Sequence, residues 1–230
     1  MTRKALDDSD GAELARAEEQ QRELARRVEV PAGRVPEPRT VAGVDVSYVP
    51  GSLRVAAAAV VVERGTDGTV DPLVVDEVVV EGEVSFPYRP GLLAFREVPM
   101  LLEALGALRR LPDLVLCDGQ GLAHPARCGL ACHLGVVTGL ATVGCAKSWY
   151  VGRGDEPGPR RGDRAPLRDG GDLVGHVLRT QDGVRPVYVS PGHRIGFEQA
   201  CDIVLATCSR FRLPDPLRRA DHISRQALKG

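Results

Sequence analysis

Three apolar segments in succession, each rich in valine or alanine, constrain the fold of this chain most strongly. They read TVAGVDVSYV, LRVAAAAVVVER and LVVDEVVVEGEV, at residues 40–49, 53–64 and 73–84. The turn-forming sequences PGS and GTDG separate them, at residues 50–52 and 65–68. Runs rich in β-branched residues that are joined by such short connections are typical of neighbouring antiparallel strands. We therefore predict a three-stranded antiparallel unit in the first half of the chain.

Helical and strand-like segments alternate after this unit. The patterns predict helices at 99–110, 129–140, 196–211 and 215–228, and strands at 111–120, 141–151 and 185–190. Three strands followed by such an alternation indicate an α/β fold, in which helices flank a mixed central sheet. The order matches the ribonuclease H-like layout. A length of 230 residues with 43% hydrophobic content suits a single domain.

Caps and breakers set the expected ends of several segments. A charged helix is predicted at 11–29, before the breaker VPAGRVPEP. Pro99 suits the first turn of the helix that follows the antiparallel unit. In the last helix we expect Asp215 as the N-cap residue, with Pro216 in the first turn. Residues 152–172, rich in Gly, Pro, Arg and Asp, form the one long loop signal.

The composition excludes several classes of protein. A formal net charge of −1 gives no overall reason for a polyanionic partner, so a nucleic-acid site must come from local clustering. No apolar run reaches the ~18 residues that span a bilayer, and the charged N-terminus lacks a signal-peptide core. The six cysteines form no C-x-x-C pair, which favours buried reduced thiols over a disulfide or zinc framework. We expect a cytoplasmic protein with no membrane partner.

Three acidic residues lie where the pattern predicts burial. Asp45 belongs to a strand that is largely non-polar on both faces, and Asp118 follows the apolar run LVLC at a strand's carboxyl end. Asp221 lies on the inward face of the last helix, with Leu217, Ala220, Ser224 and Leu228. Each acid could instead cap an element or pair with an arginine. Carboxylates gathered together repel one another, and Mg²⁺ or Mn²⁺ relieves that repulsion, which suits hydrolysis of a phosphate ester.

Basic residues accompany these acids. His124 precedes Pro125 at the entrance of a predicted helix, where a phosphate could bind, although a surface histidine in a loop is as consistent with the sequence. Lys147 ends an apolar run in a chain whose basic residues are nearly all arginine. Its amine could hold a phosphate or stabilise developing charge, or it could simply extend into solvent from a strand end. His193, in the turn sequence SPGHR, is a weaker candidate.

The stretch SFPYRPGLLAFREVP, at residues 85–99, is a stiff corner followed by an apolar turn. Pro87 and Pro90 bracket a tyrosine and an arginine, a glycine follows at once, and Glu97 closes the apolar run. A simple connection between a strand and a helix would explain the prolines and the glycine. It would not explain a tyrosine held on a rigid corner or an acid at the end of the run.

These motifs together resemble one family, endonuclease V, the deoxyinosine 3′-endonucleases. The resemblance covers about residues 40 to 225 and includes, in the family's order, VAGVDVSY, FPYRPGLLAFRE, LVLCDGQGLAHPARCGLACHLGV, GCAKSW, VYVSPGHRIGFEQA and FRLPDPLRRAD. It implies a ribonuclease H-like fold and Mg²⁺-dependent cleavage of nucleic acid that contains hypoxanthine, with Mn²⁺ as a substitute. In this family the cut falls at the second phosphodiester 3′ to the lesion and leaves 3′-hydroxyl and 5′-phosphate ends. Residues 31–230 would then form the catalytic domain and residues 1–30 a helical extension.

The resemblance also implies roles for individual residues. The family's metal-site acids correspond to Asp45, Glu97 and Asp118. Asp221 corresponds to a position near the metal, and His124 and Lys147 to basic residues beside the phosphate. The strand-separating wedge corresponds to Pro87, Tyr88, Arg89 and Pro90. The glycines that line the lesion-base pocket correspond to Gly91, Gly119 and Gly121. The chain departs from the family pattern at Arg89, where an aliphatic residue is usual, and at Ala126, where arginine is expected.

Several functions therefore compete at this stage. The first is a DNA-repair enzyme whose partner is deoxyinosine-containing DNA, and we expect it to be a monomer. The second is a nuclease that acts mainly on inosine in RNA, and a contact to the 2′-hydroxyl would distinguish it. The third is a module that binds structured nucleic acid without cutting it, against which the intact acids Asp45, Glu97 and Asp118 argue. The last is an α/β protein whose acids are only structural.

Overall fold

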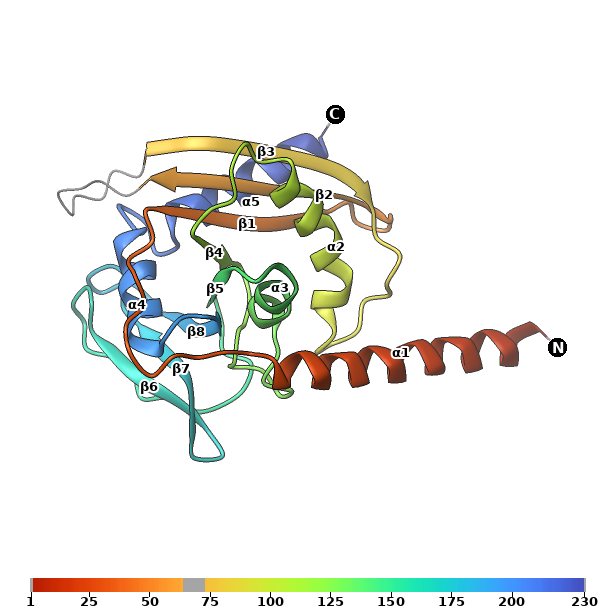
Figure 1. The fold of residues 1–230 in the computed structure, drawn as a ribbon, viewed down its shortest axis with the longest axis horizontal. Coiled ribbons are helices and arrows are strands. Elements are labelled where there is room, and N and C mark those ends of the chain that lie inside the picture. The colour runs from red at the N-terminus through yellow and green to blue at the C-terminus, as the bar shows by residue number, and fades with distance from the viewer. Residues whose placement is uncertain (1, 64–72, 230) are drawn as a thin grey trace.

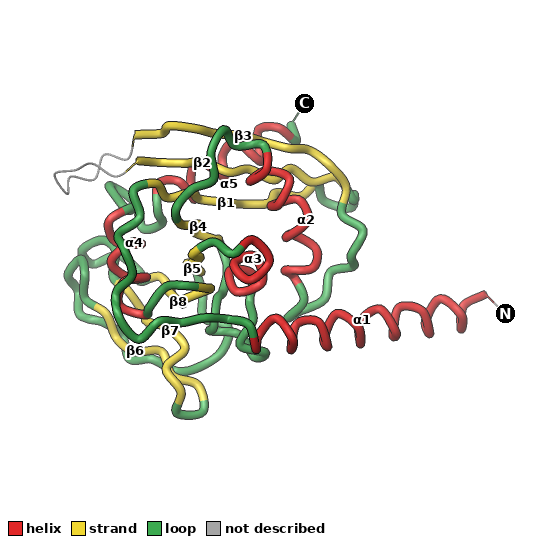
Figure 2. The backbone as a smooth tube through the Cα atoms, viewed as in Figure 1, coloured by secondary structure: helices red, strands yellow, loops and turns green. Residues whose placement is uncertain are grey.

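In the computed structural model, described for residues 2–63 and 73–229, eight strands form one sheet in the order β3-β2-β1-β4-β5-β8-β7-β6. The strands are β1 Thr40–Tyr48, β2 Arg54–Glu63, β3 Leu73–Glu83, β4 Leu114–Cys117, β5 Ala141–Ala146, β6 Arg164–Asp169, β7 Asp172–Leu178 and β8 Val187–His193. The helices are α1 Thr2–Arg26, α2 Leu93–Gly106, α3 Leu130–Thr138, α4 Phe197–Ala206 and α5 Asp215–Ala227. Figure 2 shows the strands as one twisted layer among the helices.

The sheet combines antiparallel and parallel pairing. Strands β1, β2 and β3 pair antiparallel, which confirms the predicted three-stranded unit. The turn predicted at 65–68 lies outside the described residues. Strand β4 pairs parallel to β1 and to β5, and β8 returns antiparallel beside β5. This mixed sheet, flanked by helices in a single unit, confirms the predicted α/β fold.

The two faces of the sheet are covered by different helices (Figure 1). Leu101 of α2 and Leu134 of α3 belong to the core on one face, and Ile203 of α4 and Leu217 of α5 to the core on the other. Helix α5 lies against β1 at Gly43, where an added Cβ would come within 2.3 Å of the Pro216 carbonyl carbon. Glycine at this position therefore lets the last helix approach the strand that carries Asp45.

Helix α1 projects from the body of the molecule, with its N-terminal end pointing away from it (Figure 1). Its C-terminal half buries Ala17, Gln21 and Leu24. The Gln21 amide donates to the carbonyl oxygen of Cys128 at 2.9 Å and to that of Gly91 at 2.8 Å. The predicted N-terminal helix is therefore present, and it braces two loops that belong to the site described below.

Three local predictions were wrong. Helix α2 begins at Leu93 instead of Pro99, so Pro99 lies inside it on an exposed position and Glu97 is helical. Asp215 is the first residue of α5 instead of its N-cap, and its carboxylate accepts from the backbone N–H of Ser209 at 3.0 Å. The segment predicted as a long loop contains β6 and the start of β7, because Pro and Gly signals obscured a short antiparallel hairpin.

The cysteine prediction is confirmed. All six cysteines are free and buried. Burial raises the pKa of Cys128 to about 12 and likewise that of Cys201. Among the described residues, no helix is both long enough and apolar enough to cross a bilayer.

Candidate active site

Asp45 lies on the central strand β1, half-buried beneath helix α5. Its carboxylate accepts a hydrogen bond from the Ser224 hydroxyl at 3.1 Å, and that hydroxyl also lies 2.8 Å from the Ser47 hydroxyl. Desolvation, together with the negative charges of Asp118 and Asp221, raises the pKa of Asp45 to about 6. The close approach of α5 at Gly43 therefore supplies a hydrogen-bond donor that partly offsets this cost.

Glu97 reaches the same region from helix α2, on the other face of the sheet. Its side chain is buried, and its carboxylate accepts a hydrogen bond from the Tyr48 hydroxyl of β1 at 2.9 Å. Burial raises the pKa of Glu97 to about 8, and the charges of Asp45 and Asp118 act in the same direction against the hydrogen bond from Tyr48. The Arg96 guanidinium lies 5.0 Å from the centre of the Tyr48 ring, which favours one orientation of that ring.

Asp118 and Lys147 come from the carboxyl ends of two adjacent parallel strands. Cys117, the last residue of β4, pairs with Gly144 of β5, so the residues that follow the two strands emerge side by side. Lys147 Nζ lies 2.5 Å from Asp118 Oδ2. Burial alone would lower the pKa of Lys147, but the hydrogen bond and charge of Asp118, with the charges of Asp45 and Asp221, raise it overall. The lysine is therefore a cation held at the acid cluster.

The four predicted acids thus converge from four elements, but each has a side-chain partner. Asp45 is bonded to Ser224, Glu97 to Tyr48 and Asp118 to Lys147, and Asp221 forms an ion pair with Arg225 at 2.8 Å. In the part of the chain that the structure describes, no group of three His, Cys, Asp or Glu side chains is placed as ligands of one ion. The donor chemistry nevertheless fits a hard divalent cation, because burial and then repulsion among the carboxylates raise the pKa values of Asp45 and Glu97.

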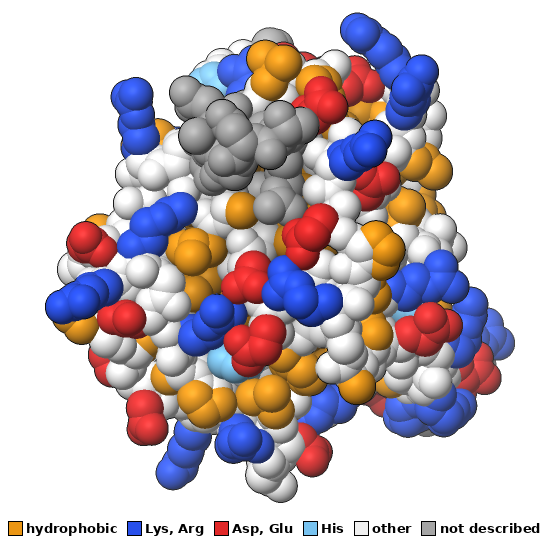
Figure 3. Space-filling view, turned by 60° about the vertical axis from the view of Figure 1, so that its left-hand side comes forward, with side chains coloured by type: hydrophobic (Ala, Val, Ile, Leu, Met, Phe, Trp, Pro, Cys, Tyr) orange, Lys and Arg blue, Asp and Glu red, His pale blue; other side chains and the backbone are white. Residues whose placement is uncertain are grey.

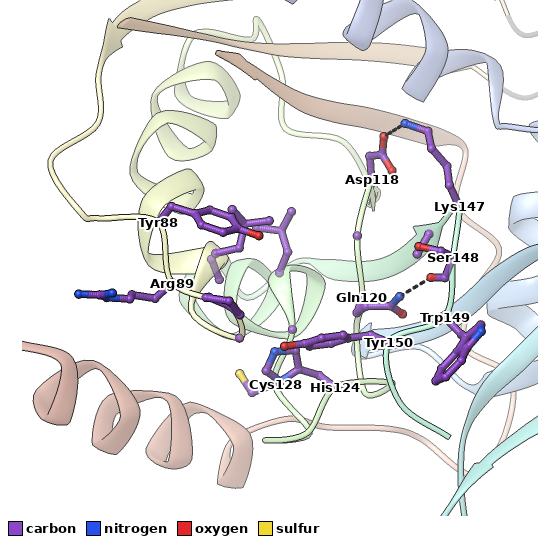
Figure 4. A pocket seen from close by; sticks show the side chains of 18 residues that line it. Tyr88, Arg89, Asp118, Gln120, His124, Cys128, Lys147, Ser148, Trp149 and Tyr150 are labelled. Atoms are coloured by element: carbon purple, nitrogen blue, oxygen red, sulfur yellow. Dashed lines mark hydrogen bonds and ion pairs between the residues drawn. The ribbon is translucent and has the colours of Figure 1, made fainter. Parts of the chain in front are cut away.

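A cavity of about 440 Å³ opens beside the acid cluster. In Figure 4, Tyr88 and Arg89 lie on one side of it, and Asp118 and Lys147 on the other. The Tyr88 side chain is 67% exposed, as expected of a probe that meets a ligand from outside. The Arg89 side chain extends away from the cavity in this view. The other predicted residues that line it are Pro90, Gly91, Gly119 and His124.

The three predicted glycines have different surroundings. Gly91 has φ of +85°, which favours glycine, and a Cβ there would lie 3.6 Å from the Tyr150 hydroxyl. Gly119 lines the cavity and leaves ordinary space for a Cβ. Gly121 does not line it, and a Cβ there would come within 2.1 Å of the Pro191 carbonyl oxygen. Glycine at this position is thus required by close packing of the loop on β8.

His124 is buried at the floor of the cavity. Its Nδ1 accepts from the backbone N–H of Ala126 at 3.2 Å, and its ring packs against Tyr150 with centroids 5.3 Å apart. Burial lowers the pKa of His124 to about 4. The imidazole is therefore neutral near pH 7 and would not meet a phosphate as a cation, and its hydrogen bond to the Gly91 backbone acts against the effect of burial. His193, the weaker candidate, is buried at the end of β8, where its Nδ1 accepts from the Glu29 backbone N–H at 3.1 Å.

The sequence analysis missed a second group of aromatic residues at this cavity. Trp149 and Tyr150 follow Lys147 after one intervening serine, and they line the cavity with Gln120 and Ser148. Their side chains are 61% and 42% exposed, in a chain with only 4% aromatic residues. The scarcity of aromatic residues could have pointed to this segment, since Trp149 is the only tryptophan in the sequence. The Gln120 amide donates to the Ser148 carbonyl at 2.9 Å and so joins the loop after β4 to the loop after β5 (Figure 4).

Charges of both signs are interspersed over the face shown in Figure 3, in keeping with a net charge of −1. Attraction of a polyanion would therefore depend on local groups of cations, as the sequence indicated.

Comparisons with known proteins agree with the resemblance. A family model described as endonuclease V matches residues 22–222. Endonuclease V of Streptomyces avermitilis is 53% identical over 196 residues, which cover 84% of this chain and 83% of that protein. A crystal structure of endonuclease V from Streptomyces avermitilis superimposes with a TM-score of 0.87 at 49% identity, covering 94% of this chain and 92% of that one. Endonuclease V of Ciona intestinalis, crystallised with a 24mer DNA containing an inosine followed by a ribo-adenosine, superimposes with a TM-score of 0.80 at 26% identity, covering 95% of this chain and 98% of that one.

Proposed function

Because this chain belongs to the endonuclease V family, and is therefore a nuclease that acts on phosphodiester bonds, we propose that it cuts DNA containing deoxyinosine in DNA repair. The cut falls at the second phosphodiester 3′ to the lesion and leaves 3′-hydroxyl and 5′-phosphate ends. The observation that carries this proposal is the cavity lined by Tyr88 and Gly91, which opens directly onto Asp118 and Lys147. A base held in this cavity would place its own strand beside the acid cluster.

Recognition begins with extrusion of the damaged base from the duplex. Unstacking costs a few kcal/mol, and less for a mispaired base, which itself favours hypoxanthine over normal bases. Tyr88, on a corner stiffened by Pro87 and Pro90, fills the gap left in the stack. The base enters the cavity. Gly91 and Gly119 line it and have no side chains, so their backbone groups can come close to the edge of the base. The complex of the Ciona relative with inosine-containing DNA supports this substrate class.

The chemistry is assigned to the acid cluster and Lys147. Asp45 and Asp118 would hold Mg²⁺, for which Mn²⁺ would substitute, and Glu97 and Asp221 would act from beside that site. The ion, when bound, supplies charge neutralisation and an activated water for hydrolysis. Lys147, already placed at Asp118, steadies the negative charge of the phosphate or of the leaving oxygen. His124 stands beside the phosphate as a neutral imidazole and adds no positive charge there.

Other expectations from the sequence remain part of this proposal. The protein acts as a monomer in the cytoplasm, with residues 31–230 as the catalytic domain and residues 1–30 as a helical extension. The bonds from Gln21 to Gly91 and Cys128 indicate that the extension contributes to the shape of the site. The strand containing inosine could instead be RNA, and the acid cluster serves both substrates equally well.

The test uses 5′-labelled strands that carry deoxyinosine in DNA or inosine in RNA, each with Mg²⁺ and with EDTA. We expect a Mg²⁺-dependent product from the DNA strand that ends at the second phosphodiester 3′ to the lesion. A product from the RNA strand alone would favour the endoribonuclease. Binding of both strands without any metal-dependent nick would instead indicate a module that recognises nucleic acid without cutting it.

A further inference from the structure

A second groove lies on the other side of the Asp118–Lys147 ion pair. It has a volume of about 450 Å³, and its lining comprises Asp118, Lys147, Leu213, Leu217, Arg218, Asp221, His222, Arg225, Gln226 and Lys229. Asp118 and Lys147 line both this groove and the base cavity. The acid cluster therefore stands at the junction of two depressions. A strand whose base occupies the cavity could continue across the junction into the second groove.

The two depressions have different linings. The base cavity contains the rings of Tyr88, Trp149 and Tyr150, which suit the flat faces of a base. The lining of the second groove contains none of the chain's tyrosine, tryptophan or phenylalanine side chains among the described residues. Its side chains are mainly charged and come largely from helix α5. Such a lining suits a sugar–phosphate backbone better than a base.

The charge balance of the second groove is positive. Its two carboxylates are already paired, Asp118 with Lys147 and Asp221 with Arg225. Within residues 2–63 and 73–229, Arg218 and Lys229 form no ion pair with an acid. Two lining cations therefore remain available for phosphate groups.

Arg218 is held in place by stacking. Its guanidinium lies 3.3 Å from the centre of the Phe211 ring, and Phe211 is 46% exposed. The Phe211 ring packs on the guanidinium, and among the described residues the guanidinium N–H groups donate to no protein acceptor. A stacked guanidinium loses less side-chain freedom on binding than a free one, and its donors match a phosphate oxygen pair.

We propose that the second groove holds the sugar–phosphate backbone on the 3′ side of the lesion, with Arg218 and Lys229 as its phosphate contacts. This inference rests on the proposed function, because the side of the lesion is set by where the cut falls. Arg218, positioned by Phe211, and Lys229 would then anchor the strand beyond the bond that is cut. The groove is thus a determinant of how much 3′ strand the enzyme requires.

The test measures binding of deoxyinosine strands in EDTA by fluorescence anisotropy, so that it does not depend on cutting. Two substrates share one 5′ arm and differ only in the 3′ arm, which is long in one and stops just beyond the cut site in the other. We expect Arg218→Ala and Lys229→Ala to weaken binding of the long-armed strand roughly three- to tenfold each. Their effect on the short-armed strand should be small. For the long arm, each substitution should also reduce the slope of log affinity against log salt by about 0.7.

Two further variants make the result specific. Phe211→Ala should reproduce part of the Arg218→Ala effect, because it removes the surface that orients the guanidinium. Arg219→Ala is the matched control, since Arg219 is the next residue of α5 and pairs with Glu77 at 2.9 Å outside the groove. Equal weakening of both strands by Arg218→Ala and Lys229→Ala, or no change in either, would overturn the proposal. If the wild type binds long-armed strands but never nicks them, the proposed function fails while the groove is still tested by binding.

Discussion

The Tyr48 hydroxyl and the Glu97 carboxylate are hydrogen-bonded at 2.9 Å, and this bond joins the central strand to helix α2 inside the acid cluster. A buried acid held in this way contributes to stability in a pH-dependent manner. Because burial raises the pKa of Glu97 from 4.5 to about 8, the folded state retains its proton where the unfolded state has lost it. The stabilisation is complete below 4.5 and is lost as the pH rises through about 8.

We therefore predict that Glu97→Gln raises the melting temperature in EDTA, and that the gain over wild type grows as the pH rises from 4.5 to about 8. Glutamine can still accept the Tyr48 hydrogen bond, and one unit of pKa displacement corresponds to about 1.4 kcal/mol. Several degrees of difference are expected at the alkaline end. Glu103→Gln, at an exposed position of the same helix, is the control and should show no such trend. A gain that is constant across the pH range would mean that Glu97 is not a buried proton-binding group.

If Tyr88 acts as a wedge in the duplex, lesion binding should require the aromatic ring at this position. Tyr88→Ala should weaken binding of deoxyinosine strands by about 1–3 kcal/mol, because a stacking surface is lost. Tyr88→Phe keeps the ring and should bind close to wild type. The measurement is an anisotropy titration, followed by single-turnover cutting with saturating enzyme. If Tyr88→Ala binds and cuts like the wild type, the wedge assignment is wrong.

A third prediction concerns the contribution of helix α1 to the base cavity. Gln21→Ala removes two hydrogen bonds and leaves the buried carbonyl of Cys128 without that donor, which costs about 1–3 kcal/mol. We expect lower thermal stability and weaker lesion binding together, because Gly91 loses its brace. Gln20→Ala, at the exposed neighbouring position, should change neither. A loss of stability with unchanged lesion affinity would show that α1 does not shape the cavity.

We predict that Arg212 positions Lys147 for catalysis. Its guanidinium donates to the Lys147 carbonyl at 2.6 Å and to the Pro186 carbonyl at 2.7 Å, so it fixes the backbone from which the lysine extends. Arg212→Ala should lower the single-turnover rate about tenfold, because the lysine is misplaced. Substrate affinity should change little. Arg210→Ala removes an exposed arginine two positions away and serves as control; an equal loss in both variants would point to general charge.

The sequence predicted the elements of this site better than its contacts. Asp45 and Asp118 could be placed because both follow or occupy apolar strands, and parallel neighbours bring such positions to one edge of a sheet. The donors to these acids, Ser224 and Tyr48, depend on how α5 and α2 pack on β1, which no local pattern encodes.

Other contacts were hidden for different reasons. The pairing of Asp118 with Lys147 follows from the register of β4 and β5, and this register is decided by tertiary packing. The start of α2 was misplaced because proline favours the first turn of a helix, although a proline on the exposed side is tolerated within this helix. Trp149 and Tyr150 were overlooked because a strand was predicted through them, whereas β5 ends at Ala146.

Asp45→Asn is the decisive substitution for the proposal that the acid cluster performs metal-dependent hydrolysis at a bound deoxyinosine strand. The measurement is the single-turnover rate of Mg²⁺-dependent nicking of a 5′-labelled deoxyinosine strand, with binding measured alongside on the same preparation. Asparagine keeps an acceptor for Ser224 but removes the charge that a divalent cation requires. We predict that nicking falls by about a thousandfold or more while lesion binding is retained. Nicking at the wild-type rate by the folded variant would show that the acid cluster does not perform the hydrolysis.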